Sequence, residues 1–82
     1  MVIDLTVGQL VMFKPDVSHV ISNYEIDISG LIGVVRYYHH DPANEDRDVL
    51  AIKLEKHFDD LNEWDNCVEF YGEDGGINAL PA

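Results

Sequence analysis

Positive charge is scarce in this chain of 82 residues, which has five Lys and Arg against sixteen Asp and Glu and a formal net charge of −11. A surface with this charge repels nucleic-acid phosphates and anionic lipid headgroups. We therefore expect no direct binding to nucleic acid and none to membranes. Basic protein partners and cations remain open.

Cysteine is almost missing, since Cys67 is the single residue of its kind. One cysteine excludes an internal disulfide and fits a reducing compartment. No apolar run approaches the roughly 20 residues of a membrane helix, and residues 1–5 have neither the basic region nor the apolar run of a signal peptide. We therefore expect a cytoplasmic location.

Motifs of catalysis and of cofactor binding are absent as well. The chain has no Gly-Lys-Ser/Thr phosphate loop and no dinucleotide-binding glycine fingerprint. Asp59 and Asp60 are consecutive, and consecutive carboxylates rarely flank one reacting bond. Cys67 lies between Asp65 and Glu69, whose charges raise a thiol pKa rather than lower it. We therefore predict a protein that is not an enzyme and that uses no cofactor.

Short apolar runs between turn-forming residues are what the chain does contain, at residues 10–13, 31–38, 49–54 and 64–71. Their β-branched and aromatic residues predict β-strands. Gly33, inside the second run, predicts a bulge or a tight bend. The strand pattern is clearest in the last two runs, where alternate residues form one apolar face: Leu50, Ile52 and Leu54, then Trp64, Asn66, Val68 and Phe70.

Residues 16–29 are ambiguous, because their apolar residues fit two periods. Val17, Val20 and Ile21 continue to Tyr24 and Ile28 as a helical stripe that Asp16 could cap. Yet residues 24–28 also alternate between apolar and acidic, as in a strand. We predict a short helical turn near residues 16–22, followed by extended chain to residue 28.

The fold class follows from the number and length of these strands. Four or five short strands cannot bury both faces of a flat sheet, so we expect them to close on themselves. Residues 77–80 supply a short closing strand. We predict one mainly β domain over residues 1–82, a small barrel of four to five short antiparallel strands.

The layout of the strands resembles a known family of small barrels. A glycine-led first strand (residues 7–11) precedes a second with the sequence Gly-x-Val-Arg-Tyr (residues 30–37), and further strands follow at 50–55 and 66–71. This order is similar to that of SH3-like barrels, and of CAP-Gly domains in particular, over residues 7–76. The resemblance implies the fold class.

The ligand motif of CAP-Gly domains is not present here. Those domains recognise C-terminal acidic-aromatic tails through a Gly-Lys-Asn-Asp-Gly loop. The corresponding residues 57–62 contain neither the lysine nor the glycines. Asp59 and Asp60 instead place negative charge where an acidic ligand would approach. No ligand and no binding residue of that family is therefore transferred to this chain.

Histidines and acidic loops are the candidates for a metal site. His39, His40 and Asp41 are of suitable types for zinc, nickel or copper. Adjacent residues of a strand point to opposite faces, so a further ligand would have to come from His57 or Asp59. Residues 41–48 lack the alternating oxygen ligands and the central glycine of a calcium loop. We therefore predict no metal site.

Aromatic and acidic residues are the candidates for a binding surface, because aromatic side chains line the peptide grooves of SH3-type modules. A basic ligand would suit the aromatic faces and the carboxylates together. The alternative is that Trp64 and Phe70 fill a thin core. The predicted binding residues are Tyr37, Tyr38, Trp64, Tyr71, Asp59 and Asp60.

These features favour a noncatalytic interaction module that binds a protein partner or itself as a homo-oligomer. The alternative is an acidic nucleic-acid mimic that inhibits a DNA- or RNA-binding protein. A mimic requires the carboxylates of residues 41–48 and 59–65 to lie along one face at phosphate-like spacing. A metal-dependent enzyme is the third hypothesis.

Overall fold

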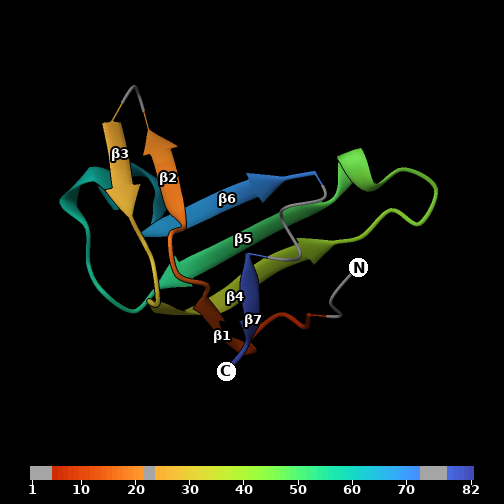
Figure 1. The fold of residues 1–82 in the computed structure, drawn as a ribbon, viewed down its shortest axis with the longest axis horizontal. Coiled ribbons are helices and arrows are strands. Elements are labelled where there is room, and N and C mark those ends of the chain that lie inside the picture. The colour runs from red at the N-terminus through yellow and green to blue at the C-terminus, as the bar shows by residue number, and fades with distance from the viewer. Residues whose placement is uncertain (1–4, 22–23, 73–77) are drawn as a thin grey trace.

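The computed structural model describes residues 5–21, 24–72 and 78–82, and it confirms the mainly β class (Figure 1). In chain order its elements are β1 (Leu10–Phe13), β2 (Ser18–Ile21), β3 (Tyr24–Asp27), β4 (Ile32–His39), the 3-10 helix η1 (Glu45–Arg47), β5 (Val49–Leu54), the 3-10 helix η2 (Asp59–Trp64), β6 (Cys67–Tyr71) and β7 (Ala79–Pro81). The described residues include no helix with the length and apolarity needed to cross a membrane.

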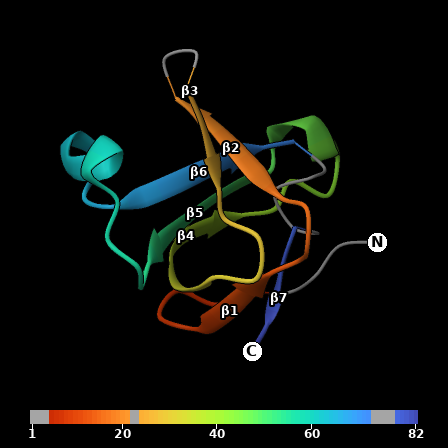
Figure 2. The same cartoon turned by 60° about the vertical axis from the view of Figure 1, so that its left-hand side comes forward.

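Five antiparallel strands form the main sheet, in the order β6-β5-β4-β1-β7, and β2 pairs with β3 in a separate hairpin. The predicted closing strand is found in β7, which pairs with β1. The expected closure into a barrel does not occur among the described residues, because β6 and β7 are the two edges of the sheet. The hairpin stands on one side of the sheet in both ribbon views and covers part of it instead (Figures 1 and 2).

The predicted helical turn near residues 16–22 is wrong. Residues 18–21 form β2, whose register with β3 runs from Ser18 opposite Asp27 to Ile21 opposite Tyr24. Asp16 has a φ of 63°, whereas a helix N-cap adopts extended backbone angles. It belongs to the turn that begins at Pro15. The alternation of apolar and acidic residues, rather than the helical stripe, describes this segment.

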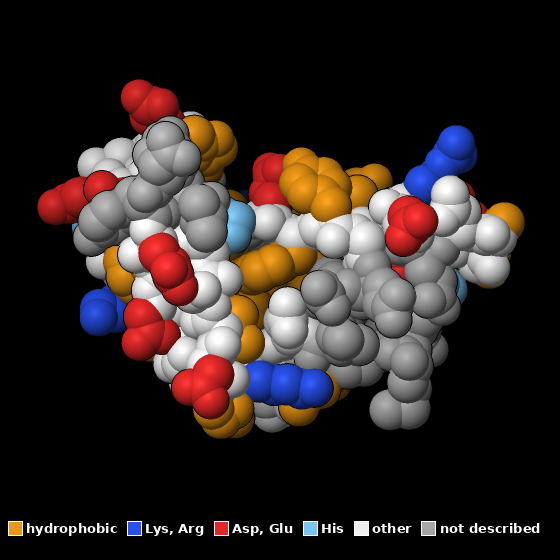
Figure 3. All heavy atoms as spheres, turned by 45° about the horizontal axis from the view of Figure 1, so that its top comes forward, with side chains coloured by type: hydrophobic (Ala, Val, Ile, Leu, Met, Phe, Trp, Pro, Cys, Tyr) orange, Lys and Arg blue, Asp and Glu red, His pale blue; other side chains and the backbone are white. Residues whose placement is uncertain are grey.

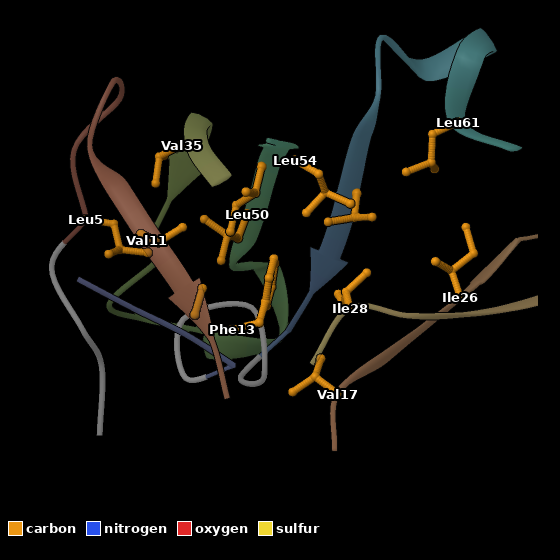
Figure 4. Packing of buried hydrophobic residues seen from close by; sticks show 13 residues of the cluster. Leu5, Val11, Phe13, Val17, Ile26, Ile28, Val35, Leu50, Leu54 and Leu61 are labelled. Atoms are coloured by element: carbon orange, nitrogen blue, oxygen red, sulfur yellow. The ribbon is translucent and has the colours of Figure 1, made fainter. Parts of the chain in front are cut away.

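The core lies between the sheet and the hairpin, with a contribution from η2. Figure 4 shows side chains of the sheet, such as Val11 and Leu50, facing Ile28 and Val17, while Leu61 reaches the cluster from η2. The predicted inward face of β5 is confirmed. The buried apolar residues are Leu5, Val11, Phe13, Val17, Ile26, Ile28, Val35, Leu50, Ile52, Leu54, Leu61, Val68 and Ala79.

Gly33 marks a close approach between two strands. A Cβ at this position would lie 2.5 Å from Cγ2 of Ile52 and 2.7 Å from the carbonyl oxygen of Lys53. The irregularity in the β4–β5 pairing comes later, between Val35 and Tyr37. The glycine therefore serves the packing of β4 on β5, and the extra residue of the bulge, Arg36, lies three residues beyond it.

The bulge changes which residues of β4 face the core. Before it, Val35 is buried and its neighbours point away from the core; after it, Tyr38 packs against the core and Tyr37 points away. Because one extra residue inverts the alternation of a strand, Tyr37 joins the same face of the sheet as Ala51 of β5. The bulge thus decides the composition of the outer side of the sheet.

Candidate interaction surface

The side of the five-stranded sheet that points away from the core is called the outer face here. The strand register arranges its residues in four cross-strand rows. From one end of the sheet to the other, these rows are Ile32, Met12 and Leu80; Leu10, Val34, Lys53 and Cys67; Tyr37, Ala51 and Glu69; and His39, Val49 and Tyr71.

Large apolar side chains on the outer face are open to solvent. Their exposed fractions are 55% for Leu10, 47% for Met12, 38% for Ile32 and Leu80, 52% for Tyr37 and 66% for Tyr71. Single exposed apolar residues are ordinary on protein surfaces, but a contiguous set of them marks an interaction site. Leu10, Met12, Ile32 and Leu80 occupy the two adjoining rows at one end. Val34, Val49 and Ala51 connect them to Tyr37 and Tyr71, so that the six belong to one apolar patch.

Two of the predicted binding residues, Tyr37 and Tyr71, belong to this face. They lie on β4 and β6, and Ala51 and Val49 of the intervening strand form a low strip between them. The hydroxyl of Tyr71 donates a hydrogen bond of 2.5 Å to the carboxylate of Glu69, which raises the pKa of Tyr71. The two rings therefore border a shallow strip of small side chains.

The other four predicted residues lie elsewhere. Tyr38 is half-buried against the core, and Trp64 ends η2 with 46% of its surface exposed. Asp59 and Asp60 open η2, and Asp59 accepts a hydrogen bond from Nε2 of His57 at 3.0 Å. Figure 1 shows η1 and η2 at opposite ends of β5. Asp59, Asp60 and Trp64 thus share η2, whereas Tyr37 and Tyr71 share the outer face and Tyr38 packs against the core.

A hollow of about 520 Å³ opens at one end of the outer face. Leu10, Ile32 and Val34 give it an apolar wall, and Lys53 and Glu55 are its charged lining residues. Hollows of this kind accept a large side chain of a partner, while polar groups at the rim fix its orientation. No pattern in the sequence predicted the hollow.

Three charged residues form an ionic cluster beside the outer face. Oδ2 of Asp65 is 2.5 Å from Nη2 of Arg36, and its Oδ1 is 3.5 Å from Nζ of Lys53. Asp65 has a φ of 54° in the turn between η2 and β6. This turn carries a carboxylate to the two cations of the face. All three side chains are well exposed, so the pairs contribute little to stability.

The surface positions of Leu10, Met12, Ile32 and Leu80 were not predicted from the sequence. A signal was present, because residues 10–13 and 31–35 are apolar at consecutive positions rather than at alternate ones. Continuous apolar runs are typical of strands that are covered on both faces. Here one face is covered by the hairpin and the other is open among the described residues.

The histidines near β5 have separate environments. His39 is exposed on the outer face, and Nδ1 of His40 lies 3.0 Å from both carboxylate oxygens of Asp48. His57 follows β5 and is at its opposite end. Within residues 5–21, 24–72 and 78–82, no group of three or more His, Cys, Asp or Glu is arranged to hold a metal ion.

The pKa values of Asp48 and Cys67 are also shifted from their ordinary values. Asp48 is buried, and the backbone N–H of Asp41, at 2.8 Å, holds the pKa of its carboxyl below the usual value, with His40 adding to the effect. Burial raises the pKa of the half-buried Cys67 thiol, and Asp65 contributes in the same direction. Asp48 therefore anchors a loop, and Cys67 has no sign of activation.

Comparison of the chain with models of known protein families, with curated proteins and with solved structures found no match. The function therefore has to be inferred from the chemistry of the surface. The outer face, with its large apolar side chains exposed to solvent, is the surface feature that points to a function most directly.

Proposed function

We propose that this protein is a noncatalytic interaction module that binds through the outer face of its five-stranded sheet. The contiguous exposure of Leu10, Met12, Ile32, Tyr37, Tyr71 and Leu80 is the observation that carries the proposal. Exposed apolar area in water is unfavourable, and covering it by a partner releases that free energy.

Aromatic side chains strengthen this proposal. Tyr37 and Tyr71 are rigid and amphipathic, and tyrosine is one of the residue types that dominate binding energy at protein interfaces. The hydrogen bond between Tyr71 and Glu69 fixes one of these rings before any partner arrives. A preorganised ring loses less conformational freedom on binding.

The acidic nucleic-acid mimic has weaker support. The segments 41–48 and 59–65 are joined by β5 and lie at its opposite ends (Figure 1). Asp48 accepts hydrogen bonds within its own loop, and Asp65 is paired with Arg36 and Lys53. Asp48 and Asp65 are therefore engaged within the chain and are not presented to a partner as free charges.

Photo-crosslinking tests the proposed function. A benzophenone amino acid is placed at Tyr37 on the outer face or, as control, at Glu25, which is exposed on the hairpin. After irradiation in an extract of cells that produce the protein, we expect discrete adducts, whether with another protein or with a second copy, from position 37 only. Excess wild-type protein should suppress them, and excess Met12→Lys should not.

Two results would overturn the proposal. Adducts of equal yield and identity from positions 37 and 25 would mean that the outer face has no preference for a partner. Suppression by Met12→Lys as effective as that by wild type would mean that the apolar patch is not the binding surface. Circular dichroism of each variant confirms that it has kept its strand content.

A further inference from the structure

The outer face differs in charge from the rest of this acidic chain. It, its hollow and the adjoining turn hold two cations, Arg36 and Lys53, and three anions, Glu55, Asp65 and Glu69. Asp65 contacts both cations, and Glu69 accepts the hydrogen bond of Tyr71. The patch is therefore close to neutral, although the whole chain has a net charge of −11.

Acidic residues gather on other parts of the surface. Asp16, Glu25 and Asp27 are exposed around the hairpin, and Figure 3 shows Asp and Glu side chains over that side of the molecule. Further acids lie in the segments at the two ends of β5. A strongly basic partner would be drawn to these regions, because electrostatic attraction steers it to the most negative potential. The nearly neutral outer face suits a different occupant.

The size of the patch is close to what a stable dimer requires. If a fully exposed side chain of this kind presents roughly 150–250 Å², the six exposed apolar residues contribute roughly 450–750 Å². Stable interfaces bury about 800 Å² per partner. Val34, Val49, Ala51 and the aliphatic part of Lys53 lie between the six and are partly exposed, which brings the face to that size.

We propose that the outer face is the interface of a homodimer, in which the five-stranded sheets of two copies pack against each other. This inference rests on the proposed function and names its partner as a second copy of the chain. Packed sheets are about 10 Å apart, with strand directions within about 30° of each other. The four-row apolar pattern supplies the inner layer of such a sandwich.

Charge distribution makes this arrangement compatible with a highly acidic chain. In a face-to-face pair the hairpins of the two copies point away from each other, because each hairpin is on the side of its sheet opposite the interface. Acids that are farther apart than the Debye length of about 8 Å at physiological ionic strength repel each other weakly. The cluster of Arg36, Lys53 and Asp65 has a net charge of +1 in each copy, which offsets one of the two nearby carboxylates, Glu55 and Glu69.

Sedimentation equilibrium with the purified full chain tests the dimer. Between about 1 µM and about 1 mM protein, we expect the mass to rise toward twice the 9.3 kDa of one chain. Met12→Lys places a charge within the patch and should raise the dissociation constant of the dimer at least about tenfold. Glu25→Gln changes the net charge by the same amount on the hairpin and should leave the dimer intact.

Salt dependence adds a second readout. Raising NaCl from about 0.05 M to about 0.5 M screens the repulsion between the acidic copies, so the dimer should become tighter. An interface formed by opposite charges would weaken instead. Weakening with salt, a wild-type chain that stays monomeric at about 1 mM, or equal association of wild type and Met12→Lys would each overturn the homodimer.

The two proposals fail in distinguishable ways. A monomeric wild-type chain whose Tyr37 crosslinks to another protein, with suppression by wild type but not by Met12→Lys, overturns the homodimer and leaves the interaction module in place. A dimer that Met12→Lys does not affect, together with equal crosslinking from positions 37 and 25, overturns both.

Discussion

The two faces of the five-stranded sheet are built from alternate residues of the same strands, and both are apolar. On the inner face, Val11, Val35 and Ile52 are fully buried, whereas Leu10 and Tyr37 on the outer face keep about half of their surface in solvent, at 55% and 52%. Composition alone therefore does not separate them. The difference lies in the hairpin and η2, which cover one face and leave the other open.

This difference separates residues that hold the fold from residues that are available for contact. Burying an aliphatic side chain fully contributes about 1.5–3 kcal/mol to folding. Apolar side chains that remain half in water contribute less, so folding of the single chain does not account for their character. Burying these side chains of the outer face against a partner instead supplies favourable free energy for association.

The largest expected difference between the faces is in the free energy of unfolding. Leu50→Ala empties a buried position on β5 and should lower it by about 2–5 kcal/mol. Met12→Ala, on the outer face, should change it by about 0.5 kcal/mol or less. Urea denaturation followed by circular dichroism measures both, at a protein concentration where the chain is monomeric. Equal losses would show that the two faces contribute alike to the fold.

A smaller loss is expected where β4 and β5 approach each other most closely. Gly33→Ala places a Cβ 2.5 Å from Cγ2 of Ile52 and 2.7 Å from the backbone oxygen of Lys53. The strands have to separate, which should lower the free energy of unfolding by about 1–3 kcal/mol. Val34→Ala, one residue along and on the outer face, is the matched control and should cost less. A neutral Gly33→Ala would contradict the close packing.

The mainly β class was predictable from the sequence because the strands of the sheet carry clear signals. In β5, Leu50, Ile52 and Leu54 alternate with Val49, Ala51 and Lys53, and only one register buries all three. Val68 and Phe70 of β6 behave in the same way. These local patterns agree with the tertiary structure, so the prediction held.

Residues 16–28 could not be assigned in this way. Their apolar positions satisfy the helical period and the strand period together, and the choice depends on pairing between β2 and β3. The positive φ of Asp16, 63°, is likewise a property of the folded turn. Asp is tolerated at such angles and is also a good N-cap, so its identity did not distinguish the two cases.

The candidate site was predictable only in part, because adjacent residues of a strand face opposite sides of the sheet. Tyr37 and Tyr38 are adjacent, so a single face can hold one of them. The bulge between Val35 and Tyr37 decides which one, and no glycine or proline marks it. Trp64 was expected on the apolar face of the fourth strand, but η2 extends through it and β6 begins at Cys67.

The free energy of unfolding is expected to depend on pH through Asp48, a buried residue in the loop before β5. The folded-state pKa of Asp48 is lowered from its ordinary value of 3.8, first by the N–H of Asp41 and then by His40. The ionised carboxylate therefore stabilises the fold above pH 3.8, and this contribution disappears as the pH falls through the lowered folded-state value.

Asp48→Asn tests this linkage. At pH 7 the variant should unfold at a lower urea concentration than wild type, and the difference should shrink as the pH falls to about 2.5. Asp46→Asn, in the exposed part of the same loop, should match wild type at every pH. A difference between Asp48→Asn and wild type that persists undiminished at low pH would assign the effect to shape rather than to charge.

The smallest expected effect is on the outer face, where it changes the pKa of the Tyr71 hydroxyl and not the stability of the fold. The hydrogen bond that Tyr71 donates to Glu69 is lost when the phenol ionises, and the carboxylate repels the resulting phenolate, so the pKa of Tyr71 is raised above its ordinary value of 10.0. Glu69→Gln removes the charge and should bring the pKa of Tyr71 down. A nuclear magnetic resonance titration of the Cζ carbon measures the pKa of Tyr71.

Glu63→Gln, in η2 at the other end of the sheet, is the control and should leave the pKa of Tyr71 at its wild-type value. An unchanged Tyr71 in Glu69→Gln would mean that the ring is not held by its neighbour, and the outer face would then lose its preorganised anchor while the inner face stayed as it is.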